Sequence, residues 1–156
     1  IISLILAGKV GSSIASEIGT MRVTEQIDAL KVMGINPANY LILPKITAAM
    51  LFFPVLIIFS IAVGLGGGLL AVFITGSVTT TDFIDGLQAW WQPFDIFYAL
   101  IKTVVFAFII ASVSGYKGYT VSGGSVEVGR ASTKAVVSSS ILIIIFDLIL
   151  TQMLLT

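Results

Sequence analysis

Two ionisable side chains interrupt long apolar runs of the sequence and are its first candidates for chemistry. Lys102 lies within residues 96–116, and Asp147 lies within residues 135–155. A charge at the centre of a bilayer costs at least about 2.5 to 3.5 kcal/mol on insertion scales, so it is expected to be paired, hydrated or snorkelling. We predict that Lys102 and Asp147 form an ion pair or share a polar cavity that holds a lipid head group. The alternative is that Lys102 reaches the outer surface alone.

Other side chains that could carry out catalysis are absent or unsupported. The chain of 156 residues contains no Cys and no His, which excludes disulfides and thiolate or imidazole metal sites and bases. Residues 124–130 echo a phosphate-binding loop, but Arg130 and Ala131 replace its Lys and hydroxyl residue, and Glu127 would repel phosphate. Ser138 to Ser140 have no His partner and are interpreted as helix-packing hydroxyls. We predict no catalytic residue, no metal site and no cofactor bound by this chain.

Three long apolar runs must position these residues. Each of the runs 46–75, 96–116 and 135–155 can cross a bilayer, whose hydrocarbon core takes about 20 helical residues. Hydrophobic residues make up 57% of the chain and charged residues 10%. With no water at mid-membrane to satisfy backbone amides, the spans are expected to be helices. The predicted fold is an all-α polytopic membrane helical bundle, a single domain over residues 1–156 with transmembrane helices at 44–75, 96–116 and 135–155.

The chain begins within an apolar segment. Ile1 to Gly8 would be about 12 Å long as a helix, which is too short to span a membrane alone. We therefore interpret residues 1–19 as the end of a transmembrane helix whose start is missing.

Basic residues are distributed unevenly between the segments that join the spans. Residues 9–45 hold four Lys or Arg and residues 117–134 hold three, whereas residues 76–95 hold none and carry three Asp. By the positive-inside rule, 117–134 is a cytoplasmic loop and 76–95 a periplasmic loop. Trp90 and Trp91 suit the outer membrane interface, and a buried packing contact is the alternative. Across the chain, eight Lys and Arg balance eight Asp and Glu, so no positive field predicts a nucleic-acid partner.

The first full span contains residues that bend helices or let them approach closely. Pro54 is expected to kink it. Gly64, Gly67 and Gly68 form a stretch of small residues against which another backbone can pack. Packing within this chain is the favoured interpretation because such spacing is common in membrane bundles, and a subunit interface or flexible gate is the alternative.

An amphipathic helix is predicted at residues 20–34, on the cytoplasmic side. Val23, Ile27, Leu30 and Met33 form one apolar stripe that can lie on the membrane domain, and Gly34 ends the helix. The opposite face mixes charged with apolar residues, which suggests a second partner. A helix held crosswise beneath a bundle can transmit motion from a soluble motor, and a plain interfacial helix on lipid is the alternative.

The same region carries a family resemblance. Gly8 to Leu30 reads GKVGSSIASEIGTMRVTEQIDAL, and Met33 to Pro37 and Leu43-Pro44 follow it. With these motifs, the chain strongly resembles the MlaE-type (YrbE) permease family of ABC lipid transporters. Further similar stretches extend the resemblance over essentially all 156 residues: Gly64 to Gly68, Ile101 to Ala107, Gly129 to Thr133 and Asp147 to Thr151. Lys9 departs from the family, which more often has Arg there, so any bidentate contact at this position is in doubt.

The resemblance implies a homodimeric permease of the bacterial cell inner membrane. Such a permease binds a cytosolic ABC ATPase, which holds ATP and Mg, and on the outer side an MCE-domain periplasmic lipid-binding protein. It moves phospholipids between the inner and outer membranes and so maintains outer-membrane lipid asymmetry. Residues 20–34 would be the coupling helix. Its expected ATPase-docking residues are Met21, Arg22, Glu25, Gln26, Asp28, Ala29, Lys31 and Val32.

By analogy, Lys102, Arg130 and Asp147 match polar positions of the family. The alternative function is an ion- or proton-coupled secondary transporter or channel, in which Lys102 and Asp147 form the relay and no ATPase is needed.

Overall fold

The computed structural model describes residues 1–76, 78–89 and 92–155, and those residues form helices and short connections without a strand. Among these described residues, four helical segments are long and apolar enough to cross a membrane: Ile2–Val23, Ala38–Thr75, Pro93–Tyr119 and Ser125–Leu154. These segments confirm the predicted all-α polytopic bundle and make the chain a multi-pass membrane protein. The predicted interfacial pair Trp90 and Trp91 lies outside the described residues.

The first spanning segment is built from α1 (Ile2–Leu6), the π-helical turn η1 (Ala7–Gly11) and α2 (Ser12–Val23). The backbone at both joints, Leu6 and Ser12, is right-handed helical, so the three pieces form one continuous helix. The boundary predicted at residue 19 is therefore replaced by one at Val23. Hydropathy alone placed the end too early because the helix continues into polar residues.

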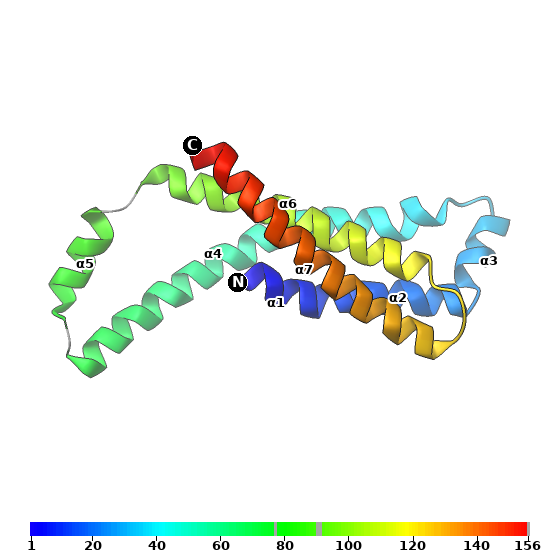
Figure 1. The fold of residues 1–156 in the computed structure, drawn as a ribbon, viewed down its shortest axis with the longest axis horizontal. Coiled ribbons are helices and arrows are strands. Elements are labelled where there is room, and N and C mark those ends of the chain that lie inside the picture. The colour runs from blue at the N-terminus through cyan, green and yellow to red at the C-terminus, as the bar shows by residue number, and fades with distance from the viewer. Residues whose placement is uncertain (77, 90–91, 156) are drawn as a thin grey trace.

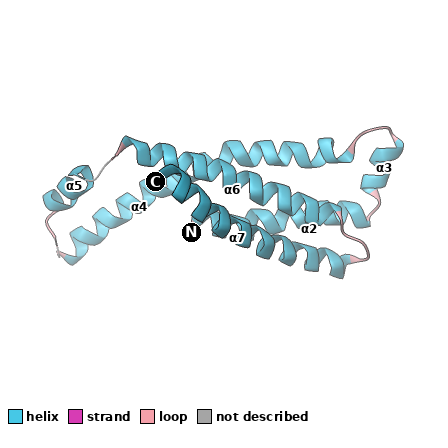
Figure 2. Cartoon of the chain, turned by 45° about the horizontal axis from the view of Figure 1, so that its top comes forward, coloured by secondary structure: helices cyan, strands magenta, loops and turns pink. Residues whose placement is uncertain are grey.

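A short helix, α3 (Gln26–Val32), follows α2 and lies across the end of the bundle in Figures 1 and 2. It is separated from α2 at Thr24 and Glu25, and Glu25 has a left-handed backbone with φ of 61°, which is uncommon for a residue other than Gly. The helix predicted over residues 20–34 is thus wrong as a single element. Its 3.6-residue periodicity was real within α3 but does not continue across the break.

The end of α3 follows the prediction that Gly34 stops the helix. Gly34 has φ of 76°, its N–H donates to the carbonyl of Lys31 at 3.0 Å, and the N–H of Ile35 donates to the carbonyl of Leu30 at 3.0 Å. These two bonds form a Schellman motif, in which a left-handed residue satisfies the last helical carbonyls.

Four more helices complete the chain. The turn η2 (Ala38–Ile42) leads into α4 (Leu43–Thr75), which continues through Pro54 and ends at Gly76, and α5 (Thr80–Ala89), α6 (Pro93–Tyr119) and α7 (Ser125–Leu155) follow. The predicted periplasmic loop 76–95 therefore contains a helix. The predicted cytoplasmic loop 117–134 shrinks to residues 120–124, because α6 and α7 both extend beyond their apolar runs into charged sequence.

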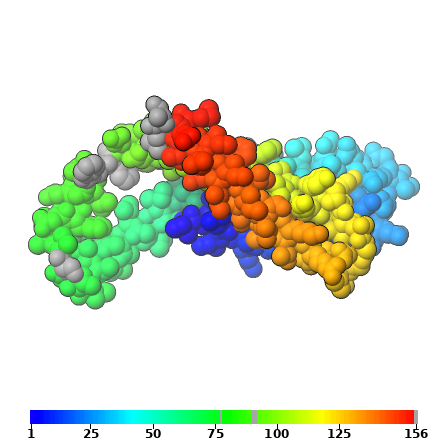
Figure 3. All heavy atoms as spheres, viewed as in Figure 1, coloured from blue at the N-terminus to red at the C-terminus, as the bar shows by residue number. Residues whose placement is uncertain are grey.

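The hydrophobic core lies where α2, α6, α7 and the first part of α4 pack together. Its fully buried side chains include Ile18 of α2, Ile27 of α3 and Ile110 of α6. In contrast, the buried residues of α4 are Ala49 and Phe53, both in its first half. The later half of α4 leaves the bundle, and α5 joins it to α6 (Figures 1 and 3). We call the two ends of the molecule the α3 end and the α5 end.

Candidate functional site

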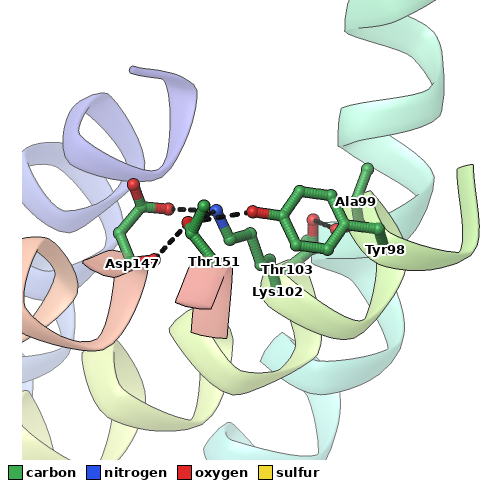
Figure 4. Close-up of polar contacts among 6 residues, drawn as sticks. All are labelled: Tyr98, Ala99, Lys102, Thr103, Asp147 and Thr151. Atoms are coloured by element: carbon green, nitrogen blue, oxygen red, sulfur yellow. Dashed lines mark hydrogen bonds and ion pairs between the residues drawn. The ribbon is translucent and has the colours of Figure 1, made fainter. Parts of the chain in front are cut away.

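The two ionisable residues predicted to meet within the membrane are in contact. Lys102 of α6 places its Nζ 2.7 Å from Oδ1 of Asp147 on α7 (Figure 4), and the exposed fractions of the two side chains are 14% and 52%. The Lys102 side chain is therefore largely shielded, while Asp147 keeps one side open. The alternative in which Lys102 snorkels alone is not the arrangement in this structure.

Two neighbours that sequence reasoning missed complete a polar network around this ion pair. Lys102 Nζ donates to Oγ1 of Thr151 at 2.8 Å, the hydroxyl of Tyr98 donates to the same atom at 2.9 Å, and Thr151 donates to the carbonyl of Asp147. Lys102 also lies 4.4 Å from the centre of the Tyr98 ring. A sequence signal existed, because Tyr98 and Lys102, like Asp147 and Thr151, are four residues apart and share a helix face.

Thr151 is the central member of this network. The Thr151 hydroxyl donates once and accepts twice, which is its complete capacity. A satisfied polar cluster of this kind holds α6 and α7 in one register. The open side of Asp147 borders a hollow of about 140 Å³ that is also lined by Ser3, Phe106 and Ile143. The arrangement therefore places an ion pair, with its carboxylate exposed, at the edge of a small, mainly apolar cavity.

A second polar cluster surrounds α3. Asp28 of α3 accepts from Arg22 of α2 at 2.7 Å and from Lys31 at 3.1 Å. The hydrogen bonds from Lys31 and Arg22 hold the pKa of the Asp28 carboxyl below its ordinary value. Lys31 also lies 5.9 Å from the centre of the Tyr119 ring at the end of α6. Asp28 thus bridges the break between α2 and α3.

The two faces of α3 differ in burial, partly as predicted. Ile27 is fully buried in the core, whereas Val32 is 89% exposed. Two details of the prediction are wrong: Met33 of the apolar stripe is 65% exposed, and Met21, assigned to the partner-binding face, packs on the core. Met21 belongs to α2, before the break at Glu25, and Met33 follows the last residue of α3, so the two methionines do not lie on one continuous helix. The remaining docking candidates on α3 are exposed: Gln26, Asp28, Ala29, Lys31 and Val32.

The glycines of α4 do not pack as the favoured interpretation expected. A Cβ added at Gly64 or Gly67 would meet nothing within 4 Å, and only at Gly68 would it approach another side chain, the Phe83 ring at 3.2 Å. These helix positions lie in the part of α4 that leaves the bundle. Close packing at Gly64 and Gly67 within this chain is therefore contradicted, and the open face is left for another molecule.

One interhelical contact was not anticipated from the sequence. Lys45 at the start of α4 lies 2.7 Å from Glu17 of α2. The two residues are 28 positions apart, so no helical periodicity could have paired them. The contact ties α4 to α2 at the α3 end, where the core also lies.

Comparisons with known proteins agree with this architecture. The model of a family described as Permease MlaE matches residues 1–153. A probable ABC transporter permease protein of Rickettsia prowazekii is 43% identical over 150 residues, which cover 96% of this chain and 58% of that protein. A probable ABC transporter permease protein of Synechocystis is 40% identical over 148 residues, covering 95% and 56%.

A plant protein is also similar. The chloroplastic protein trigalactosyldiacylglycerol 1 of Arabidopsis thaliana is 38% identical over 152 residues, which cover 97% of this chain and 43% of that protein. The chain thus spans little more than half the length of the two bacterial relatives and less of the plant one. The family predicted from the sequence is confirmed.

Proposed function

Because the chain belongs to the MlaE permease family, we propose that it acts as the membrane-spanning permease subunit of an ABC transporter. In this proposal it is a transport subunit and not an enzyme. The observation that carries it is α3, a short helix held across one end of a membrane bundle with a buried face and an exposed face. Relatives named as probable ABC transporter permease proteins support the same role.

The partner at α3 is proposed to be a cytosolic ABC ATPase, which binds ATP and Mg. Ile27 anchors α3 in the core and Asp28 ties it to α2, so a push on the exposed face is transmitted to the bundle. The apolar side chain of Val32, 89% exposed, is the kind of group that an interface buries. ATP binding and hydrolysis in the partner would favour one packing of the helices over another through differential contacts.

A second copy of the chain is proposed to cover the open face of α4. Gly64 and Gly67 leave room for close backbone approach, and small residues are enriched where transmembrane helices associate. The exposed side chains on the same part of the helix are apolar, among them Val63 and Leu70.

The transported substrate is proposed to be a phospholipid moved between inner and outer membranes, with the chain in the bacterial inner membrane. An apolar hollow of about 290 Å³ at the α5 end, lined by Ile61, Leu87 and Ile96 with Asp95 at its edge, suits an acyl chain near a polar group. The open carboxylate of the Lys102–Asp147 pair can accept a hydrogen bond from a polar head group. An MCE-domain periplasmic protein is the proposed partner on this side, and maintenance of outer-membrane lipid asymmetry the proposed outcome.

A pair of matched substitutions tests the docking of the ATPase. Val32→Glu places a charge on the exposed face of α3, and we expect it to abolish co-purification of the ATPase while the permease remains folded. Val78→Glu makes the same change at an exposed residue of the α5 end and is expected to leave co-purification intact. Retention of the ATPase by Val32→Glu would contradict the docking site.

A transport measurement separates this proposal from the alternative. Proteoliposomes containing the complex are expected to move fluorescent phospholipid only when ATP is supplied. Transport without ATP that responds to an imposed proton gradient would instead favour an ion-coupled carrier with Lys102 and Asp147 as its relay.

A further inference from the structure

A basic hollow lies at the α3 end, separate from both clusters described above. It has a volume of about 230 Å³ and lies between the end of α6 and the beginning of α7. Three of the eight basic residues of the chain line it, namely Lys117, Arg130 and Lys134. The hydroxyl-bearing residues Thr120 and Ser122 also contribute to its wall. Such convergence of cations in one concavity needs an explanation, because like charges repel each other.

The positive charge of the hollow is only partly neutralised. Glu127 also lines it, and its Oε1 accepts from Arg130 at 2.8 Å. Lys117 and Lys134 form no ion pair within the described residues. Three cations thus face one carboxylate, which leaves two positive charges for an anion from outside the chain. The carboxylate that was expected to repel phosphate is occupied by a guanidinium.

The position of the lysines along the chain places the hollow at the depth of lipid head groups. Lys117 directly follows the apolar run 96–116, and Lys134 directly precedes the apolar run 135–155. Cationic side chains at the ends of two antiparallel membrane spans reach the level of the phosphates. Tyr116, next to Lys117, is 62% exposed, as suits an aromatic ring at the interface.

We propose that this hollow binds the phosphate-bearing head group of an anionic phospholipid from the leaflet at the α3 end. Lys117 and Lys134 supply point charges, Arg130 a planar donor, and the Ser122 hydroxyl a further hydrogen bond. The ligand is a bound lipid that stays with the protein, so the site does not depend on the transport role proposed above. Its binding holds the ends of α6 and α7 together at the turn 120–124.

Glu127 has a specific part in this proposal. As long as it accepts from Arg130, the guanidinium is shared between the carboxylate and the ligand. Removing the negative charge while keeping the shape, as in Glu127→Gln, frees Arg130 for the phosphate. The variant is therefore expected to bind the lipid more tightly than the wild type, which a hollow with a purely structural role would not do.

The experiment titrates the purified full chain in a nonionic detergent and needs no ATP or ATPase. The probes are dihexanoyl phosphatidylglycerol, dihexanoyl phosphatidylcholine and inorganic phosphate, and the readout is isothermal titration calorimetry. We expect binding of phosphatidylglycerol, weaker binding of phosphatidylcholine, and a loss of affinity of about tenfold or more in the double variant Lys117→Gln, Lys134→Gln. Lys9→Gln, which removes a cation outside the hollow, is the matched control and is expected to bind as the wild type does.

The outcomes separate the possible ligands. Equal affinity of the wild type and the double variant for phosphatidylglycerol would overturn the site. Binding of inorganic phosphate as tight as that of the lipid would overturn the lipid assignment, because the glycerol and acyl parts would then add nothing. Circular dichroism of each variant shows whether it is folded, and a tighter Glu127→Gln supports the site even if the double variant fails to fold.

Discussion

Both ends of this molecule carry glycines on membrane-spanning helices, but the helices are packed differently at the two ends. At the α3 end, glycines lie against neighbouring helices: a Cβ on Gly118 would lie 2.6 Å from the carbonyl oxygen of Ala15, and one on Gly11 would lie 2.9 Å from Ser114 Oγ. Towards the α5 end, Gly64 and Gly67 face open space. The same residue type thus marks a completed interface at one end and an uncompleted one at the other.

This difference shows what a glycine pattern can and cannot indicate. Small residues predict that a backbone will approach closely, but they do not say whether that backbone belongs to the same chain. Within the bundle, α6 packs against α2, α4 and α7, and α2 also packs against α7. Beyond Phe53, α4 contributes no buried residue, and its apolar surface is available to lipid or to a second copy.

The largest effect is expected from the same substitution made at both ends. Gly118→Leu would force α6 away from the backbone of α2, and we expect it to lower the free energy of unfolding by about 3 kcal/mol or more, or to prevent folding. Gly64→Leu adds its side chain to open space and is expected to leave the stability of the single chain nearly unchanged. Thermal unfolding followed by circular dichroism in detergent measures both.

If a second copy covers α4, Gly64→Leu should weaken the dimer even though it leaves the single chain stable. Gly64→Leu is then expected to reduce the fraction of dimer captured by chemical cross-linking in membranes, although the chain remains folded. Equal loss of stability in the two leucine variants would remove the distinction between the packed and the open end.

A smaller effect is expected at the polar network that keeps α6 and α7 together near the α5 end. Lys102→Ala leaves Asp147 without its cation, and we expect a cost of about 2 kcal/mol, reduced from that of a fully buried pair because Asp147 is 52% exposed. The double variant Lys102→Ala, Asp147→Ala is expected to be more stable than Lys102→Ala alone. A double-mutant cycle with no coupling energy would count against the pair.

A substitution that relieves the left-handed backbone at Glu25 is expected to stabilise the protein. A left-handed conformation costs a residue other than Gly about 1 kcal/mol, so Glu25→Gly is expected to raise the free energy of unfolding by up to that amount. Glu25→Ala, which keeps the Cβ and removes the carboxylate, is the control and is expected to give no gain. A gain in both variants would show that charge, and not backbone conformation, is the cause.

The smallest expected effect is a dependence of the stability of the fold on pH, caused by the titration of Asp28. Its pKa in the folded chain is below the ordinary value of 3.8, so its contribution to stability is complete above pH 3.8 and is lost as the pH falls through the lower folded value. The thermal midpoint should therefore not respond to Asp28 between pH 7 and pH 5. Asp28→Asn is expected to remove the acid-dependent part, and a response near neutral pH that disappears in Asp28→Asn would contradict this interpretation.

Sequence reasoning predicted the spans and one of the sites better than the connections. Lys102 and Asp147 could be paired from depth alone, because two antiparallel helices of known rise place them at nearly the same level. The family was recognisable from the motif at residues 8–30. Two helix ends were predicted too early because hydropathy marks only the apolar part of a span. The hydrogen-bonded helices continue into polar sequence and end at Val23 and Tyr119.

Other features depended on three-dimensional contacts that no local pattern contains. Glu25 gave no sign of a left-handed backbone, since Gly or Asn is the usual residue in that conformation. Because of this break, Met21 and Met33 do not share the single helix on which their surroundings were predicted. The open surroundings of Gly64 and Gly67 could not be predicted without knowing where α4 leaves the bundle. The contact of Glu17 with Lys45 required the fold itself.

Through the ring of Tyr119, α6 is in contact with α3 at one of its ends. One end of this helix touches Lys31 of the crosswise helix, and Lys102, 17 positions earlier in the same helix, anchors its other part to α7. At 1.5 Å per residue, the two points are about 26 Å apart along a stiff axis. The contact of Lys31 with Tyr119 therefore connects α3, through α6, with the Lys102–Asp147 pair in the part of the span far from α3.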